Sequence, residues 1–285
     1  MSSSSDVIAV VGAGQMGNGI AHVCAQAGLP VTLIDVSEAA LAKARATIEQ
    51  NFERQIRKGA LDASARDAAL AQLSTNADLG AISTASFAIE AATESSDLKF
   101  KLFAEMDRLA APGAILASNT SSISITTIAS HTRRPERVIG MHFMNPVPVM
   151  QLVEIIGGLA TSEATMARTV AFAKALGKVP VEAKDFPGFV ANRILMPMIN
   201  EAICCVMEGV GTADAVDTVM KLGMNHPMGP LALADLIGLD TCLAILDVLH
   251  EGFGDPKYRA SPLLRKYVAA GWLGRKTGRG FFTYA

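Results

Sequence analysis

The first two-thirds of the chain alternates short apolar runs with longer stretches of helical periodicity. Residues 7–11 form an uninterrupted apolar run, which is typical of a strand buried on both faces. Similar runs predict further strands over residues 31–35, 87–92, 114–118, 138–142, 152–156 and 179–182. Helices are predicted over residues 15–27, 37–58, 97–111 and 163–176. This alternation predicts an α/β fold in which a mostly parallel sheet carries helices on both faces.

The pattern changes after Pro187. From there to Ala270 the sequence predicts only helical segments, over residues 188–208, 212–222, 230–250 and 262–270. Gly, Pro or Asp residues separate these segments, as expected for breaks between helices. The sequence therefore predicts two domains, an α/β domain over residues 1–186 and an all-α domain over residues 187–285.

A glycine-rich turn follows the first predicted strand. Gly12, Ala13, Gly14, Gln15, Met16 and Gly17 form a G-x-G-x-x-G motif between a strand and a helix. In a dinucleotide-binding fold the first glycine permits the tight turn, the second lets the backbone approach the pyrophosphate, and the third allows close helix packing. The motif therefore indicates a Rossmann-type, doubly wound sheet with phosphates bound at the helix N-terminus.

Asp35 ends the second predicted strand, close to the distance from the glycine motif at which a ribose-binding acid is expected. A carboxylate there accepts hydrogen bonds from the adenosine ribose and repels a 2′-phosphate. The next basic residue along the chain is Lys43. The sequence therefore favours NAD over NADP.

His142 differs from the other four histidines because it lies at the carboxyl end of a predicted strand, where open α/β sheets bind ligands. Histidine titrates near neutral pH and suits the transfer of an alcohol proton. Glu154 lies within the next apolar strand, where a carboxylate is costly unless it is paired. His142 is the expected partner of Glu154; the alternative is a structural histidine and a solvent-facing glutamate on an edge strand.

Composition excludes several classes of protein. Half of the 285 residues are hydrophobic and 18% are charged, so a disordered chain is not expected. With 25 basic and 27 acidic residues, the chain has no basic excess of the kind that nucleic-acid binders show. Four cysteines without metal-ligand spacing suit a reducing compartment and predict no metal site. No signal peptide and no membrane-length apolar run is apparent, so a cytoplasmic location is expected.

Several segments together resemble the (S)-3-hydroxyacyl-CoA dehydrogenases. Residues 140–146 (GMHFMNP) resemble the family's G-x-H-F-F-N-P signature, with Met144 where Phe is usual. Residues 118–122, 187–193, 229–231, 238–240 and 274–280 also match, in the family's order. The resemblance implies a Rossmann-type domain followed by an all-α domain, and NAD-dependent oxidation of short 3-hydroxyacyl-CoA thioesters, such as 3-hydroxybutyryl-CoA. It further implies a homodimer formed through the helical domain.

The resemblance also implies roles for single residues. His142 would be the general base and Glu154 its partner, while Ser121 and Asn192 would hydrogen-bond the substrate. The nicotinamide-ribose end of the cofactor would be lined by Glu94, Lys99, Asn119 and Asn145. Asn51 would face the CoA. From the residues alone, a helix N-cap is the favoured role for Ser121, and a hydrogen bond to a backbone carbonyl is the favoured role for Asn192.

Basic residues on the long second helix add to this picture. Arg54, Arg57 and Lys58 have i, i+3 and i+4 spacing and would lie on one side of the helix. There they would bind the phosphates of CoA; the alternative is that they only face solvent. Two other functions stay open at this stage. One is a dehydrogenase acting on free β-hydroxy acids, and the other is a non-catalytic NAD-binding protein.

Overall fold

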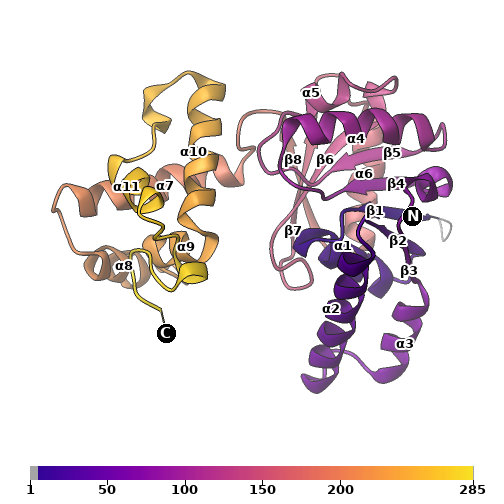
Figure 1. Cartoon of the computed structure of the whole chain (residues 1–285), viewed down its shortest axis with the longest axis horizontal. Helices are drawn as coiled ribbons and strands as arrows, with labels where there is room; N and C mark the ends of the chain where they lie inside the picture. The colour runs from indigo at the N-terminus through magenta and orange to yellow at the C-terminus, as the bar shows by residue number, and fades with distance from the viewer. Residues whose placement is uncertain (1–5, 285) are drawn as a thin grey trace. The chain divides into compact units, whose positions relative to one another are not determined.

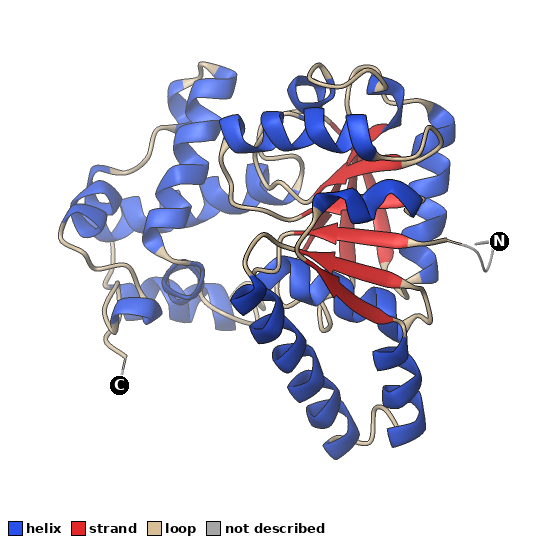
Figure 2. Cartoon of the chain, turned by 45° about the vertical axis from the view of Figure 1, so that its right-hand side comes forward, coloured by secondary structure: helices blue, strands red, loops and turns tan. Residues whose placement is uncertain are grey.

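The computed structural model describes residues 6–284. The chain forms two compact units, of which the first ends at Asp185 and the second begins at Phe186. The first unit is an eight-stranded sheet between helices, and the second consists of helices (Figures 1 and 2). The predicted fold class, a Rossmann-type sheet followed by an all-α part, is confirmed.

The sheet of the first unit has the strand order β3-β2-β1-β4-β5-β6-β7-β8. Its strands are β1 (Ile8–Val11), β2 (Val31–Ile34), β3 (Leu73–Asn76), β4 (Phe87–Glu90), β5 (Ile115–Ser118), β6 (Val138–Phe143), β7 (Leu152–Gly157) and β8 (Val179–Lys184). The strand order reverses between β1 and β4, so the loops after these two strands diverge. Such a switch point, at the carboxyl ends of parallel strands, is where open α/β sheets bind ligands.

Neighbouring strands are parallel except for β6 and β7, which are antiparallel. The connection between β6 and β7 covers only residues 144–151, and a parallel crossover needs a dozen or more residues. The antiparallel pairing therefore follows from the short connection. As a result, β7 begins at the edge of the sheet where β6 ends.

Helices cover both faces of this sheet (Figure 2). They are α1 (Gln15–Gln26), α2 (Glu38–Arg57), α3 (Ala63–Ala71), α4 (Ser96–Leu109), α5 (Ile125–Ala129) and α6 (Glu163–Ala175), with 3-10 turns η1 (Leu79–Thr84) and η2 (Pro135–Arg137). The core lies between these helices and the central strands, and every residue of β1, β4 and β5 is buried. This burial explains why these strands are continuous apolar runs in the sequence.

The sequence prediction lacks several short elements of the first unit, among them α3 and β3. Only Leu73 of β3 is buried, and the other three residues of this edge strand are exposed and polar. Without an apolar run there is no periodic signal, because this strand forms by pairing with β2 rather than by burying side chains.

The second unit packs its helices around a core that includes Met196, Ile199, Leu231, Leu239 and Leu246. The helices are α7 (Ala191–Met207), α8 (Ala213–Leu222), α9 (Pro230–Ile237), α10 (Leu239–Phe253) and α11 (Pro262–Ala269), with 3-10 turns η3 (Pro256–Tyr258) and η4 (Arg275–Thr277) (Figure 1). The prediction of a single helix over residues 230–250 is wrong, because two helices, α9 and α10, cover this range. The chain breaks at Gly238, whose φ of 103° suits glycine and ends α9 before α10 starts.

Candidate active site

The turn between β1 and α1 has the geometry of a phosphate-binding loop. Gly12 has a φ of 107°, and a Cβ there would lie 2.7 Å from the Ala91 carbonyl oxygen. A Cβ on Gly17 would lie 1.7 Å from the Gly12 carbonyl oxygen, so glycine is needed for α1 to pack this closely. Among the described residues, a Cβ on Gly14 meets no atom within 4 Å. Gly14 therefore faces open space at the start of α1, where the first-turn N–H groups have no intrahelical acceptor.

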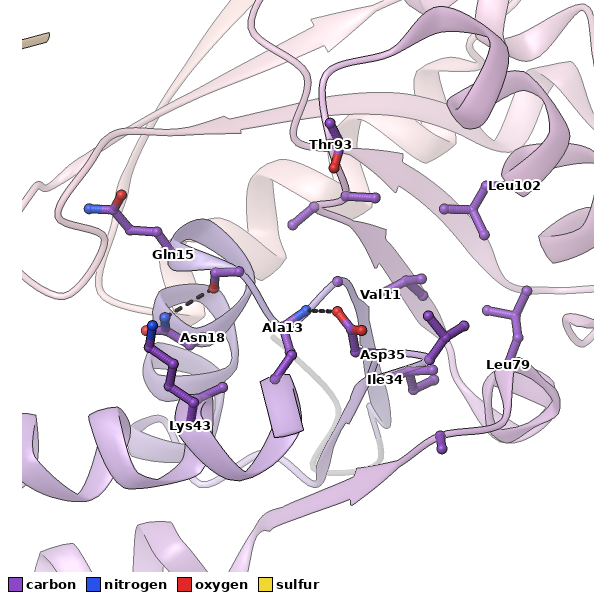
Figure 3. Close-up of a pocket in the computed structure, with 18 of the residues that line it drawn as sticks. Val11, Ala13, Gln15, Asn18, Ile34, Asp35, Lys43, Leu79, Thr93 and Leu102 are labelled. Carbon is purple, nitrogen blue, oxygen red and sulfur yellow. Dashed lines mark hydrogen bonds between the residues drawn. The ribbon is translucent and has the colours of Figure 1, made fainter. Parts of the chain in front are cut away.

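Asp35 follows β2 and lies beside this turn. Its Oδ2 accepts a hydrogen bond from the Ala13 N–H at 2.8 Å (Figure 3). Its Oδ1 accepts one from the Ser37 N–H at 2.9 Å. These two bonds fix the carboxylate at the mouth of the glycine turn. An ionised carboxylate has about four acceptor positions, so it keeps capacity for the hydroxyl groups of a ribose.

A cavity of about 700 Å³ extends from the glycine turn over the carboxyl ends of β1, β2 and β4. Gly12, Gly14, Gln15 and Asp35 line it, together with apolar side chains (Figure 3). The apolar part includes Val36, Leu79, Leu98 and Leu102. A glycine turn open to an anion, a fixed carboxylate and an apolar recess match the pyrophosphate, ribose and adenine of a dinucleotide, so the residues present fit NAD.

Several polar residues of this cavity, among them Asn18 and Lys43, are not binding candidates in the sequence analysis. Asn18 on α1 donates a hydrogen bond from Nδ2 to the Gly14 carbonyl oxygen at 3.0 Å. Lys43 on α2 lines the same cavity (Figure 3). In the sequence Lys43 counts only as the first cation after Asp35, since nothing in the local pattern shows that α2 turns this side chain toward α1.

The loop after β4 carries Glu94, which organises the loop after β5. One oxygen of Glu94 accepts hydrogen bonds from the Thr120 hydroxyl at 2.6 Å and from the Ser121 N–H at 2.9 Å. Its other oxygen lies 3.3 Å from the Lys99 ammonium. Burial by itself would raise the pKa of Glu94, but the Lys99 charge and the bonds from Thr120 and Ser121 hold that pKa below its ordinary value. Glu94 is therefore a carboxylate at neutral pH.

Lys99 lies deeper than the resemblance suggested. Its side chain is 1% exposed and its ammonium contacts Glu90 at 2.6 Å, the carbonyl oxygen of Ala92 at 3.3 Å and Glu94. Glu90, which is fully buried at the end of β4, is a residue that the sequence analysis missed. The signal was present, because Glu90 is a carboxylate at the end of an apolar strand, the same signal that singled out Glu154.

His142 and Glu154 face each other across the antiparallel pair of β6 and β7. The His142 Nδ1 lies 2.8 Å from the Glu154 Oε2, and the two side chains are 10% and 2% exposed. Glu154 is thus buried on an interior strand, so its reading as a solvent-facing residue on an edge strand is wrong. The expected contact is present, and it is made in the last residues of β6, at the carboxyl edge of the sheet.

Two amides lie near this pair. Asn119 accepts a hydrogen bond on Oδ1 from the Phe143 N–H at 2.9 Å, which ties the loop after β5 to the end of β6. Asn145 accepts one on Oδ1 from the Gln15 Nε2 at 3.1 Å, which links the loop after β6 to the first turn of α1. The segments that carry the glycine turn and the histidine pair are therefore joined by side-chain hydrogen bonds.

The sequence comparisons decide which family this site belongs to. Residues 7–186 match the family profile described as 3-hydroxyacyl-CoA dehydrogenase, NAD binding domain, and residues 188–284 match the profile of its C-terminal domain. The chain belongs to the 3-hydroxyacyl-CoA dehydrogenase family. The members of this family are NAD-dependent oxidoreductases, so the resemblance seen in the sequence and the prediction of NAD as cofactor are both confirmed.

Several members of this family are similar to the chain over nearly their whole length. A probable 3-hydroxybutyryl-CoA dehydrogenase of Bacillus subtilis is 56% identical over 97% of this chain and 96% of its own. A 3-hydroxybutyryl-CoA dehydrogenase of Bradyrhizobium diazoefficiens is 54% identical over 97% and 94%. The crystal structure of (S)-3-hydroxybutyryl-CoA dehydrogenase from Ralstonia eutropha superposes with a TM-score of 0.96 at 52% identity, over 98% of this chain and 99% of that one.

The residues that the resemblance assigned to substrate are distributed over both units. Ser121 follows β5, and Ser124 rather than Ser121 caps α5, so the N-cap alternative for Ser121 is wrong. Asn192 lies in the first turn of α7 and is buried, and its N–H donates to the Gly188 carbonyl oxygen at 3.1 Å. Met196 and Ile199 follow on the same helix and are core residues.

Asn51 lies within α2, and Lys58 follows the last residue of this helix. Within the described part of the chain, neither belongs to the lining of the dinucleotide cavity. Asn51 accepts a hydrogen bond from Arg54 at 3.2 Å. Arg54 and Arg57 line a surface hollow of about 480 Å³ together with Glu49 and Glu53, so the basic residues of α2 alternate with acidic ones. The predicted roles of these residues toward CoA stay predictions.

No helix in residues 6–284 has the length and apolar character that crossing a membrane requires.

Proposed function

We propose that this protein catalyses the NAD-dependent interconversion of (S)-3-hydroxybutyryl-CoA and acetoacetyl-CoA, with His142 as the acid–base residue and Glu154 as its partner. The observation that supports this proposal most directly is the 2.8 Å contact between the two side chains at the carboxyl edge of a sheet whose glycine turn fits NAD. The names of the relatives supply the substrate class, a short-chain acyl-CoA thioester.

The pair sets the direction in which His142 exchanges its proton. A carboxylate only accepts hydrogen bonds, so Nδ1 carries a proton and donates the hydrogen bond that Glu154 accepts. Nε2 is then the nitrogen that removes the proton from the substrate hydroxyl during oxidation and returns it during reduction. The imidazolium formed in the first case lies against the buried Glu154 carboxylate, which stabilises its positive charge.

When bound, NAD supplies the hydride acceptor at its nicotinamide ring. The chain itself positions the two reactants. Asp35 receives the ribose hydroxyls, the first turn of α1 receives the phosphates, and Glu94 with Asn119 and Asn145 orders the segments near the nicotinamide. Ser121, in the loop after β5, and Asn192, in α7, are proposed as hydrogen-bond partners of the substrate because of the family resemblance.

The test is an assay of acetoacetyl-CoA reduction by NADH, in which turnover is measured as the decrease in NADH absorbance. We expect wild-type protein to prefer NADH to NADPH because of Asp35, and to prefer the thioester to free acetoacetate. The variant His142→Gln should lose about 10²–10⁴-fold in kcat, the range typical of a general acid or base. It should bind NADH as the wild type does.

The control is His131→Gln, which changes an exposed histidine at the end of α5 by the same substitution and should leave kcat unchanged. A folded His142→Gln protein with wild-type kcat would contradict the role of the histidine. A wild-type protein that binds NADH but never consumes it with the thioester would contradict the enzymatic function as a whole.

We also propose that the protein is a homodimer formed through its helical unit. Several large apolar side chains of that unit are exposed, among them Val210 (74%), Val219 (59%) and Leu222 (83%). An apolar hollow of about 490 Å³ lies beside them, between α7 and α8. Apolar surface concentrated in one place is typical of a protein contact.

A cytoplasmic location belongs to the same proposal. All four cysteines are free thiols, and Cys24 and Cys242 are buried. Burial raises the pKa of both of these thiols to about 12, so they are unreactive. Such cysteine use is ordinary in a reducing compartment.

A further inference from the structure

Two loops at the carboxyl edge of the sheet depend on a single buried carboxylate that the mechanism above does not use. Glu90 is the last residue of β4 and lies opposite Ser118, the last residue of β5, in the parallel register. The loops that follow, residues 91–94 and 119–122, carry the groups placed near nicotinamide and substrate. Both Glu90 and Ser118 are fully buried.

The Glu90 carboxylate makes short contacts with three groups of different elements. Oε1 accepts hydrogen bonds from the Ala92 N–H at 2.6 Å and from the Lys99 ammonium at 2.6 Å. Oε2 accepts one from the Ser118 hydroxyl at 2.6 Å. The loop after β4, helix α4 and strand β5 are therefore held by one side chain.

From Glu90, two routes lead to the loop after β5. In the first, Lys99 connects Glu90 to Glu94, and Glu94 accepts hydrogen bonds from the Thr120 hydroxyl and the Ser121 N–H. In the second, the Ser118 hydroxyl donates to Glu90 and accepts from the Thr120 N–H at 3.2 Å. The first route reaches Thr120 and Ser121 and the second reaches Thr120, so a change at Glu90 acts on this loop in two ways.

The charge of Glu90 matters as much as its shape. The Lys99 ammonium is 1% exposed and cannot be solvated where it lies, so it needs a buried anion beside it. Glu94 is 39% exposed and is the more distant partner at 3.3 Å. Without the charge of Glu90, Lys99 would be drawn toward Glu94, and the Glu94 carboxylate would shift relative to the Thr120 and Ser121 donors.

We propose that Glu90 is a positioning residue for the dehydrogenase reaction, which acts through Lys99 and Glu94, and through Ser118, to fix the loop that carries Ser121. This inference rests on the proposed function, because it assumes the dehydrogenase reaction. It predicts an effect on the alignment of nicotinamide and substrate, and little effect on the adenosine half of the cofactor, which Asp35 holds at the other side of the switch point.

The test is the variant Glu90→Gln, which keeps the shape and removes the charge. We expect kcat with acetoacetyl-CoA to fall about 10- to 100-fold, because small displacements of reacting groups have effects of this size. The dissociation constant of NADH, measured by its fluorescence, should stay within about threefold of the wild-type value. The matched control is Glu105→Gln, which breaks the exposed ion pair with Arg108 on α4 and should change neither quantity.

A double-mutant cycle tests the route. If Glu90 acts in part through Lys99, the loss of kcat in Glu90→Gln/Lys99→Met should be clearly smaller than the product of the two single losses. Should Glu90→Gln fail to fold, Ser118→Ala keeps both charges and removes one contact, and it should lower kcat severalfold at an unchanged NADH affinity. Wild-type kcat in folded Glu90→Gln or in Ser118→Ala would overturn the proposal, as would losses that multiply in the double variant.

The failure of this inference is distinguishable from the failure of the proposed function. If wild-type protein does not reduce acetoacetyl-CoA, the function is wrong whatever Glu90 does. If the wild type is active, His142→Gln is inactive and Glu90→Gln is unimpaired, only the positioning role is wrong.

Discussion

His22 is a residue whose chemistry is dictated by burial rather than by the reaction. Its side chain is fully buried on α1, where the ring stacks on Phe52 of α2 at 4.1 Å. Its Nε2 contacts the Gln26 and Gln55 amides at 3.1 Å. Burial, opposed by the bond to Gln26 and reinforced by the charge of Lys178, lowers the pKa of His22 to about 4. His22 is therefore neutral in the folded protein at neutral pH.

This burial predicts a pH dependence of stability. An unfolded histidine has a pKa near 6.5, so below that pH the unfolded chain binds a proton that the folded chain does not. The free energy of unfolding should therefore fall as the pH drops from about 6.5 to about 4, by roughly 3 kcal/mol from His22. Urea unfolding followed by circular dichroism measures it, and His22→Gln should show a shallower slope.

The comparison uses the slope against pH rather than the absolute stability, because His22→Gln also loses the contact with Phe52. The exposed His131, changed to Gln, should retain the wild-type slope. Equal slopes in His22→Gln and wild type would show that His22 is protonated in the folded protein.

At the scale of elements, carboxylates from neighbouring segments hold helix starts that their own sequence leaves without a side-chain cap. The α9 helix begins after Gly229, which has no side chain to offer, and the buried Asp217 of α8 accepts hydrogen bonds from the Leu231 and Ala232 N–H groups instead. Asp235 on α9 receives the end of the chain in a similar way, through the Phe281 and Phe282 N–H groups.

Replacing Asp217 tests this capping. In Asp217→Ala two buried N–H groups lose their acceptor, which should lower the free energy of unfolding of the helical unit by about 1–3 kcal/mol. The single tryptophan, Trp272, lies in that unit and reports its unfolding by fluorescence. Thr218→Ala, at an exposed position of the same helix, is the control and should change stability by less than about 0.5 kcal/mol. An equal stability of both variants would contradict the capping role.

At the scale of the whole molecule, the helical unit carries the apolar surface that the proposed dimer would cover. Leu222 is 83% exposed at the end of α8, and Val219 lies one turn before it. The change Leu222→Asp places a charge there, which a buried interface does not tolerate without a partner. We expect the wild type to elute as a dimer in size-exclusion chromatography with light scattering, and Leu222→Asp to elute as a monomer.

Leu159→Asp is the matched control, because Leu159 is 90% exposed in the first unit and should leave the dimer intact. Trp272 fluorescence serves to check that Leu222→Asp is folded. A monomeric wild type, or a folded Leu222→Asp that keeps the dimer mass, would contradict an interface on this surface.

Features that depend on local pattern can be read from the amino-acid sequence alone. Buried strands such as β1 and β4 are apolar runs, the glycine motif lies at the strand end that needs it, and a carboxylate in an apolar strand marks Glu154 as paired. Glu90 is likewise a carboxylate at the end of an apolar strand, and this pattern indicates that it too is paired. These properties are readable because backbone geometry and burial act on neighbouring residues.

Contacts between residues far apart in the chain become known only from the folded structure. The polar strand β3 exists because β2 offers it an edge, Gly238 breaks a helical pattern that looked continuous, and α2 brings Lys43 to the dinucleotide cavity. The connection of Glu90 to Ser118 and Lys99 likewise depends on strand register and on the packing of α4. Each of these results from contacts between segments far apart in the chain, and a periodic pattern carries no record of its partners.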